Sequence, residues 1–292
     1  MAIDKLQDKI RKTKNPLVVD FSISPEYLPP YLLESEGDFL PAYERFCMEL
    51  LGALKNLIPA VRFGFDYFAL LGPDGTAALM RVMTAAKNMG YYVFLDGPEM
   101  LSPHSAAVAA EKLFGEACPY ACDGLVLISY IGSDGLRPYL DRLKATEKDL
   151  FVVVRTANKS APELQDLLTG SRLVHLARVD TVNRYAEAFV GKYGYSKVSL
   201  MAAAASGDSL RNLRAKYKEL FLLVDGFDYA ATNVKNSANA FDKLGHGAIV
   251  CCGASVTGAW KSEGDEGWKF AELAASAAER TKKSIARYVT VL

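Results

Sequence analysis

The chain has 292 residues, half of them hydrophobic, and its mean hydropathy is +0.06, so it is neither a disordered polymer nor a collagen-like chain. The 34 lysines and arginines balance the 34 aspartates and glutamates, which leaves no overall field to attract nucleic acid or anionic lipid. Since no run of about 18 apolar residues occurs, we expect no membrane-spanning helix. We therefore expect neither a nucleic acid nor a membrane as a partner, which leaves a small molecule as the candidate ligand.

The length fits one large α/β barrel of about 250 residues. No linker divides the sequence, so we expect a single domain over residues 1–292. The five cysteines are odd in number and lie mostly in apolar runs, which is typical of reduced thiols in a cytoplasmic protein. Cys118 and Cys122 have no histidine near them in the sequence, so we expect buried thiols there, with no metal and no cofactor.

Along the chain, residues 2–13 alternate charged and apolar side chains and predict a short amphipathic helix. Eight short runs rich in Val, Ile, Leu and Phe follow, at 17–21, 60–65, 91–95, 124–129, 150–155, 197–202, 220–224 and 248–252. These runs are nearly continuous in apolar residues and do not alternate. Such runs indicate strands covered on both faces, which occur in parallel sheets.

Longer segments with helical periodicity separate these runs, at 41–57, 73–89, 104–115, 134–145, 171–190, 208–219, 234–244 and 266–288. Eight strand–helix units in a chain of this size predict an α/β fold, a single (β/α)₈ TIM barrel. The extra N-terminal helix would close the bottom of the barrel. Residues 22–40 and 253–267 are expected to be loops that elaborate it.

Charged side chains stand where several predicted strands end. Asp20 ends the first strand and Asp96 follows the third, Arg62 lies in the second, and Asp225 and Asp228 follow the seventh. The active site of a TIM barrel lies at the carboxyl ends of its strands. Asp20, Arg62 and Asp96 are therefore candidate catalytic residues, and Asp225 and Asp228 are candidate ligand-binding residues. The alternative is structural: loop-capping carboxylates and an ion pair across the barrel mouth.

Three sets of segments resemble one family, the orotidine 5′-monophosphate decarboxylases. Residues 59–62 (PAVR) with 71–75 (LGPDG) resemble its second βα unit, and residues 130–140 resemble its fourth. Residues 155–158 (RTAN) with 163–167 (ELQDL) resemble the fifth strand and loop of the longer bacterial-type branch. The resemblance covers roughly residues 15–255. It implies a TIM barrel, a homodimer and a carboxy-lyase that forms UMP in pyrimidine nucleotide biosynthesis.

The resemblance also implies what the active site should contain. In the family a lysine protonates the carbon that loses carbon dioxide, and carboxylates hold that lysine charged. Here Asp96 matches the first aspartate of the array, and Pro98 stands at the lysine position. Leu101 stands where an aspartate is donated across the dimer interface, and Arg62 replaces a second lysine. Arginine keeps its proton at ordinary pH, so it can position charge but cannot act as the acid.

The phosphate site implied by the resemblance is altered too. Asp225 and Asp228 lie in the loop that should receive the phosphate, and Ala230 falls at the position of a glutamine. The arginine expected after the eighth strand is missing, with Ala254 in that segment. Like charges repel, so these carboxylates oppose a dianion.

Other family positions give weaker expectations. Asp20 matches a ribose-hydroxyl ligand. In the fifth loop Ala157 falls at a serine position that reads the pyrimidine, which leaves Thr156 and Asn158 as candidate ligand-binding residues. His104 and Glu99, in the third loop, are candidate replacement acids.

The other two histidines, His175 and His246, are expected to be structural.

The altered catalytic and phosphate positions favour a family member with a degenerate site that does not decarboxylate and has a binding or regulatory role, for which a nucleotide ligand is doubtful. One alternative is an enzyme with altered lyase chemistry on a substrate without phosphate. The other is a decarboxylase with relocated groups, such as Lys87 folded into the mouth.

Overall fold

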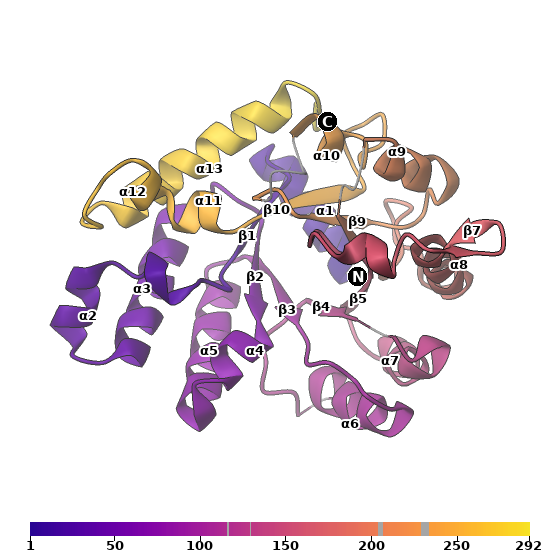
Figure 1. The fold of residues 1–292 in the computed structure, drawn as a ribbon, viewed down its shortest axis with the longest axis horizontal. Helices are drawn as coiled ribbons and strands as arrows, with labels where there is room; N and C mark the ends of the chain where they lie inside the picture. Colours follow the sequence, from indigo (N-terminus) through magenta and orange to yellow (C-terminus); the bar gives the residue numbers. More distant parts are fainter. Residues whose placement is uncertain (116, 129, 204–206, 229–233) are drawn as a thin grey trace.

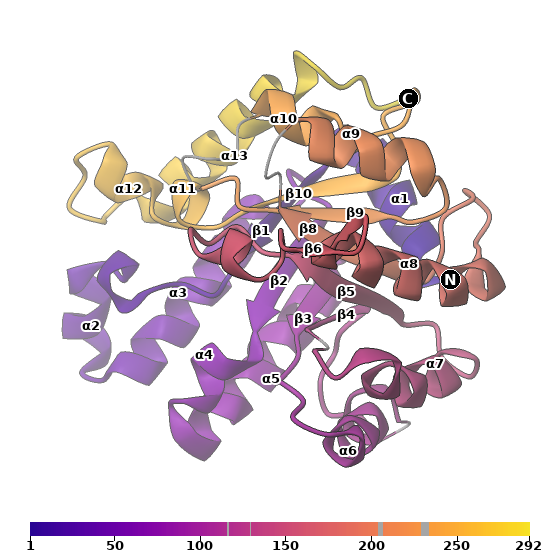
Figure 2. The ribbon, with the colours of Figure 1, turned by 45° about the vertical axis from the view of Figure 1, so that its right-hand side comes forward.

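The structure is a computed structural model that describes residues 1–115, 117–128, 130–203, 207–228 and 234–292. Eight parallel strands close into a barrel in the order β1-β10-β9-β8-β5-β4-β3-β2, with helices around it (Figure 1). The predicted TIM barrel is therefore confirmed. Figures 1 and 2 show α9, α10 and α13 on one side of the barrel and α4 to α7 on the opposite side.

The eight barrel strands coincide with the eight predicted runs to within two residues at either end. Ser129, in the fourth predicted run, lies outside the described residues. The strands are β1 (Leu17–Asp20), β2 (Ala60–Gly64), β3 (Tyr92–Asp96), β4 (Gly124–Leu127), β5 (Asp149–Arg155), β8 (Val198–Ala203), β9 (Leu222–Asp225) and β10 (Ala248–Cys252).

Each predicted helical segment contains a helix. The main helices are α3 (Phe39–Leu54), α5 (Gly72–Asn88), α6 (Pro103–Phe114), α7 (Arg137–Leu143), α8 (Val174–Ala186), α9 (Gly207–Lys216), α10 (Val234–Ala238) and α13 (Phe270–Ala286). A short α4 (Phe65–Ala69) precedes α5, and the 3₁₀ turns are η1 (Pro25–Tyr27), η2 (Gly132–Gly135), η3 (Ala161–Glu163) and η4 (Glu187–Phe189). The helix predicted at 134–145 is divided between η2 and α7, and α10 ends well before residue 244.

The two segments expected to be loops contain helices, so that expectation was wrong. Residues 22–40 hold α2 (Pro30–Glu36), and residues 253–267 hold α11 (Ala254–Thr257) and α12 (Ala259–Ser262). Helix α2 begins on a proline and ends at Gly37, whose φ is 73°. These are ordinary start and stop signals, but seven residues are too few for a clear apolar stripe. A hairpin of β6 (Leu168–Thr169) and β7 (Arg172–Leu173) also precedes α8, where a helix had been predicted from residue 171.

The N-terminal helix α1 (Ala2–Thr13) forms as predicted and lies across the amino ends of the strands. The Ala2 backbone N–H donates to the carbonyl of Glu147, just before β5, at 3.0 Å. The Gln7 side chain accepts from the N–H of Gly247, just before β10, at 3.1 Å. Both contacts lie at the end of the barrel opposite the strand carboxyl ends, so α1 closes the bottom.

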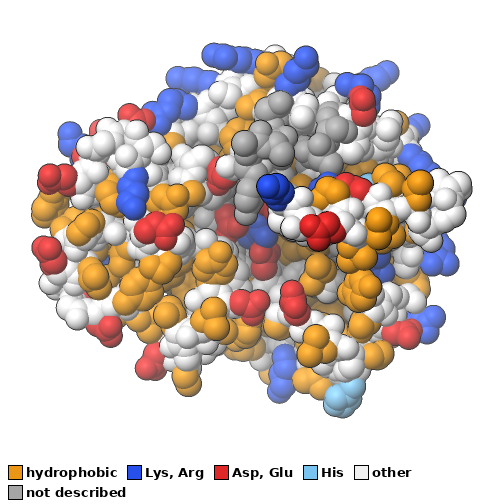
Figure 3. Space-filling view, in the orientation of Figure 1, with side chains coloured by type: hydrophobic (Ala, Val, Ile, Leu, Met, Phe, Trp, Pro, Cys, Tyr) orange, Lys and Arg blue, Asp and Glu red, His pale blue; other side chains and the backbone are white. Residues whose placement is uncertain are grey.

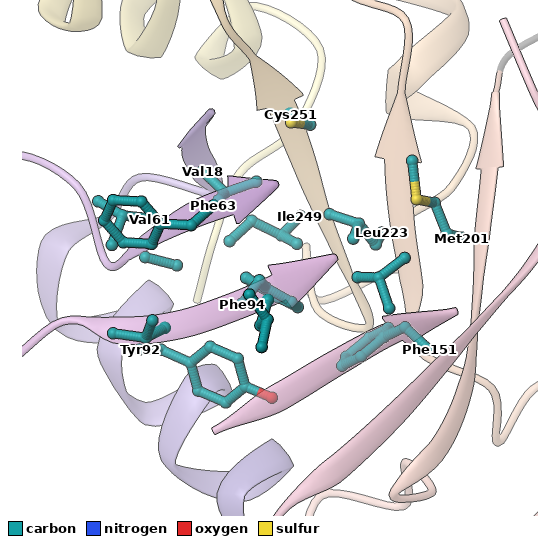
Figure 4. Packing of buried hydrophobic residues seen from close by; sticks show 14 of the residues in the cluster. Val18, Val61, Phe63, Tyr92, Phe94, Phe151, Met201, Leu223, Ile249 and Cys251 are labelled. Atoms are coloured by element: carbon teal, nitrogen blue, oxygen red, sulfur yellow. The ribbon is translucent and has the colours of Figure 1, made fainter. Parts of the chain in front are cut away.

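Packed side chains fill the inside of the barrel. Tyr92 and Phe94 of β3 and Phe151 of β5 lie side by side in Figure 4, with Leu223 and Ile249 beyond them. The ring centroids of Phe94 and Phe151 are 5.1 Å apart, and all five side chains are almost completely buried. The barrel is therefore a packed core with no open channel, as in other barrels of this kind. No helix in the described ranges is both long and apolar enough to cross a bilayer.

Candidate functional site at the barrel mouth

Four charged side chains meet where the strands end. Asp20, Asp96 and Asp225 are the last residues of β1, β3 and β9, and each is partly exposed after a buried run. Arg62 lies in β2, with its Cα opposite that of Asp20 in the strand register. Because the strands are parallel, their carboxyl ends all lie at one end of the barrel, which brings these side chains together.

Arg62 lies at the centre of this group and is only 8% exposed. Its Nε lies 2.8 Å from Oδ1 of Asp96 and its Nη2 lies 2.5 Å from Oδ2, so the two side chains form a bidentate ion pair. Its Nη1 is 3.2 Å from Oδ1 of Asp225 and 3.4 Å from Oδ2 of Asp20. The same Nη1 lies 3.4 Å from the Cys251 Sγ. One guanidinium is thus shared by three carboxylates.

The pKa values follow from this crowding. Burial alone would lower the pKa of Arg62, but the carboxylates of Asp96, Asp20 and Asp225 outweigh it and raise that pKa well above its ordinary value. For Asp96 the effect of burial is the larger one: it raises the pKa to about 6, against the opposing effect of Arg62. Arg62 is therefore a permanent cation, and Asp96 takes up a proton close to neutral pH although its side chain keeps 27% exposure.

These residues line a cavity of about 430 Å³. Figure 3, in the orientation of Figure 1, shows acidic side chains beside a basic one in the hollow near the centre of the view. Asp228 lines the cavity too, and its Oδ2 accepts the Gly253 N–H at 2.6 Å. In the described part of the chain, the lining contains one cation and no lysine. Its members are Asp20, Ser22, Arg62, Tyr67, Asp96, Asp225, Gly226, Phe227, Asp228, Cys251, Gly253 and Ala254.

The positions singled out in the third loop do not line this cavity. The Leu101 side chain is 86% exposed, and Glu99 and His104 are also exposed. Lys87, the candidate for a relocated ammonium, lies at the other end of the barrel. Its Nζ is 2.5 Å from Oδ1 of Asp123, just before β4, so that relocation does not occur.

Two predicted ligand-binding residues are not brought to the mouth cavity. The backbone N–H of Thr156 donates to Oε1 of Gln165, and Nε2 of Gln165 donates to the Thr156 hydroxyl, both at 2.8 Å. That hydroxyl also donates to Oδ1 of Asn158, which is exposed. Thr156 lines a different cavity, described below. Ala230, expected at a glutamine position, lies outside the described residues.

The sequence analysis missed the network that holds this loop. Asp166 binds Arg155 bidentately, at 2.9 Å from Nε and 2.8 Å from Nη2, and its Oδ1 lies 3.1 Å from Nδ1 of His175. His175 is buried in this network. Cys251 beside Arg62 was missed too. The period-two pattern of β10 was the available signal, because it turns Cys251 and Ile249 to the same side.

No family model matches the chain. Among curated relatives, the orotidine 5′-phosphate decarboxylase of Rhodopirellula baltica is 28% identical over 247 residues, which cover 82% of each chain. The protein of the same name from Petrotoga mobilis is 24% identical over 280 residues, or 95% of each chain. The chain is homologous to the orotidine 5′-phosphate decarboxylase family over most of its length. The segments at the second, fourth and fifth βα units had pointed to it.

Solved structures of that family share the fold. The orotidine 5′-monophosphate decarboxylase of Plasmodium berghei aligns with a TM-score of 0.76 at 15% identity, over 97% of this chain and 98% of that one. The OMP decarboxylase of Leishmania donovani aligns with a TM-score of 0.69 at 20% identity, over 97% of this chain and all of the other. In this chain the described lining of the mouth carries Arg62 as its one cationic side chain.

Proposed function

We propose that this member of the decarboxylase family does not decarboxylate orotidine 5′-monophosphate. We propose that it binds a small molecule without a phosphate, in a binding or regulatory role. The observation that carries this proposal is the Arg62–Asp96 ion pair in the mouth cavity. The pair places a guanidinium, bound by carboxylates, at the centre of a site that needs a proton donor for decarboxylation.

The chemistry of decarboxylation explains why an arginine cannot do the work of a lysine in this site. Loss of carbon dioxide from the substrate leaves a carbanion with no adjoining carbonyl to accept its charge, so the site must supply both a positive field and a proton. Arg62 supplies the field only, because its pKa lies well above its ordinary value. The residues outside the described ranges include no lysine or arginine, so they add no cation either.

The charge of the cavity opposes a phosphate. Asp20, Asp96, Asp225 and Asp228 face one arginine, and the Gly253 N–H already donates to Asp228. Each charge-assisted hydrogen bond that a phosphate loses costs about 1.5–3 kcal/mol. Two such losses weaken binding by roughly a hundredfold or more, at about 1.4 kcal/mol per factor of ten. Ligands with hydroxyl or ammonium donors suit this lining better.

A second candidate function rests on Asp96. Burial raises the pKa of its carboxyl to about 6, so this group can hold or release a proton near neutral pH. Under this alternative the barrel is a lyase of altered chemistry on a substrate without phosphate. Asp96 is the proton-transfer group, and Arg62 stabilises the negative charge of the Asp96 carboxylate. The two candidates differ in one measurable respect, since only the enzyme consumes its ligand.

The oligomeric state and the compartment are further parts of the proposal. Leu70, Leu101 and Tyr130, in the segments after β2, β3 and β4, are 88%, 86% and 81% exposed. Large apolar side chains so exposed on one end of a barrel support a homodimer that packs through these loops. All five cysteines are free, which supports a reducing compartment such as the cytoplasm.

A binding comparison tests the proposal. Uridine and UMP are titrated into the purified protein by calorimetry, and into the Asp225→Asn, Asp228→Asn double variant. We expect UMP to bind no more tightly than uridine to the wild type, and at least tenfold more tightly to the variant than to the wild type. A wild type that binds UMP a hundredfold more tightly than uridine would contradict the proposed charge selection.

A further inference from the structure

A second cavity, of about 310 Å³, lies between the segment that follows β4, the end of β5, the loop after β5 and helix α8. It shares no lining residue with the mouth cavity. Its walls are mainly apolar, and the apolar side chains that form them include Ile128, Val153, Val154, Leu164, Val174 and Ala177. We call it the side cavity.

Among the described residues that line the side cavity, Arg178 in α8 is the one lysine or arginine. Its Nε and Nη2 are buried and have no hydrogen-bond partner among the residues that the structure describes. Burial lowers the pKa of Arg178. Buried polar atoms without a partner are costly, and a ligand that pairs with these two nitrogens would remove that cost.

The neighbouring polar groups do not fill this role, because they are engaged elsewhere. Asp166 binds Arg155 and His175, and Asp180, two residues along α8 from Arg178, binds Lys216 and the hydroxyl of Tyr217. The side-chain amide of Gln165, which also lines the cavity, is bound to Thr156 through both of its polar atoms.

We propose that the side cavity binds a small organic carboxylate with an apolar body, with its carboxylate paired to Arg178. A guanidinium fits a carboxylate through two parallel hydrogen bonds. The apolar walls favour a monoanion with a hydrocarbon body over inorganic phosphate, which needs donors on every side. At about 30 Å³ per water-sized group, the cavity holds roughly ten non-hydrogen atoms. An eight-carbon carboxylate has this size.

The test uses octanoate as the probe and octanamide, which has nearly the same shape without the charge, as its control. Each is titrated into the full-length wild type by calorimetry. We expect saturable binding of octanoate, and binding of octanamide at least tenfold weaker. No saturable binding of octanoate up to about 10 mM would overturn the proposal, and so would equal affinity for the two compounds.

Variants then locate the site. Arg178→Met keeps the apolar stem and removes the charge, and Arg184→Met on the exposed face of the same helix is the matched control. We expect Arg178→Met to weaken octanoate binding at least tenfold with no fall in the melting temperature, and Arg184→Met to leave binding unchanged. Ala177→Phe, which fills the cavity, should abolish binding. Unchanged affinity in Arg178→Met, or a melting temperature that falls by several degrees, would show that Arg178 has a structural role only.

This inference is independent of the function proposed for the mouth. The Asp225→Asn, Asp228→Asn double variant should bind octanoate as the wild type does. If octanoate binding changes in that variant instead, the ligand lies in the mouth cavity, and the assignment to Arg178 is wrong.

Discussion

Arg62→Met should destabilise the fold, because it leaves three carboxylates at the barrel mouth without their shared cation. The Arg62 side chain is 10% exposed and makes a bidentate pair with Asp96, whose side chain is 27% exposed. Removing one partner of a buried ion pair costs about 3–5 kcal/mol. Since water reaches Asp96, we expect the lower end, about 3 kcal/mol. At about 2 °C per kcal/mol, the melting temperature should fall by about 6 °C.

The loss of stability in Arg62→Met should depend on pH, and it should be larger at high pH than at low pH. In the wild type burial raises the pKa of Asp96 to about 6, above its ordinary value of 3.8, so ionising it in the folded state already costs stability above pH 6. Without Arg62 the repulsion from Asp20 and Asp225 should raise that pKa further. Protonation relieves this repulsion. The difference in unfolding free energy between the variant and the wild type should therefore be larger at pH 8 than at pH 5.

Urea denaturation at both pH values measures these effects, with Arg81→Met as the control. Arg81 also makes a bidentate pair, with Glu44, but its side chain is 57% exposed, so we expect a loss of less than about 1 kcal/mol that barely depends on pH. Adding Asp96→Asn to the Arg62 variant should recover part of the stability. A loss in Arg62→Met no larger than that of the control, or one that grows towards pH 5, would refute this electrostatic explanation.

Three further outcomes are expected. Asp149→Asn should raise the unfolding free energy in urea at pH 8, because burial raises the pKa of Asp149 well above its ordinary value and an amide avoids the cost of a buried charge; a loss of stability would contradict this. Leu101→Asp should weaken dimerisation in sedimentation velocity, and a wild type that is monomeric at micromolar concentration would rule the dimer out. Pro98→Lys alone should not create decarboxylase activity in a spectrophotometric assay, because Leu101 leaves that lysine unpaired and the mouth still repels phosphate.

The strands of the barrel were predictable because each is an apolar run long enough to be covered on both faces. The short helices α2, α11 and α12 were not, since four to seven residues show no reliable period. Their stability depends on tertiary packing, as where Trp260 of α12 donates to the carbonyl of Tyr27 at 3.0 Å.

The composition of the mouth was also predictable, because parallel strands end together and Asp20, Asp96 and Asp225 end their strands. Which carboxylate pairs most closely with Arg62 was not predictable. Arg62 stands opposite Asp20 in the strand register but pairs most closely with Asp96, and side-chain rotamers decide this. Nor could the sequence show that Thr156 lies away from the mouth cavity, because the loop after β5 turns so that Thr156 binds Gln165, nine residues later in the chain.

Turnover of orotidine 5′-monophosphate by the purified wild-type protein tests most directly whether this barrel mouth still decarboxylates. The release of labelled carbon dioxide from the carboxyl group is followed over hours at micromolar enzyme, beside a curated relative such as the Rhodopirellula baltica decarboxylase under the same conditions. With Arg62 as the cation of the described lining and with no lysine there, release should equal that of buffer alone. Release above buffer that disappears in the Asp96→Asn variant would show that the mouth is a working decarboxylase site.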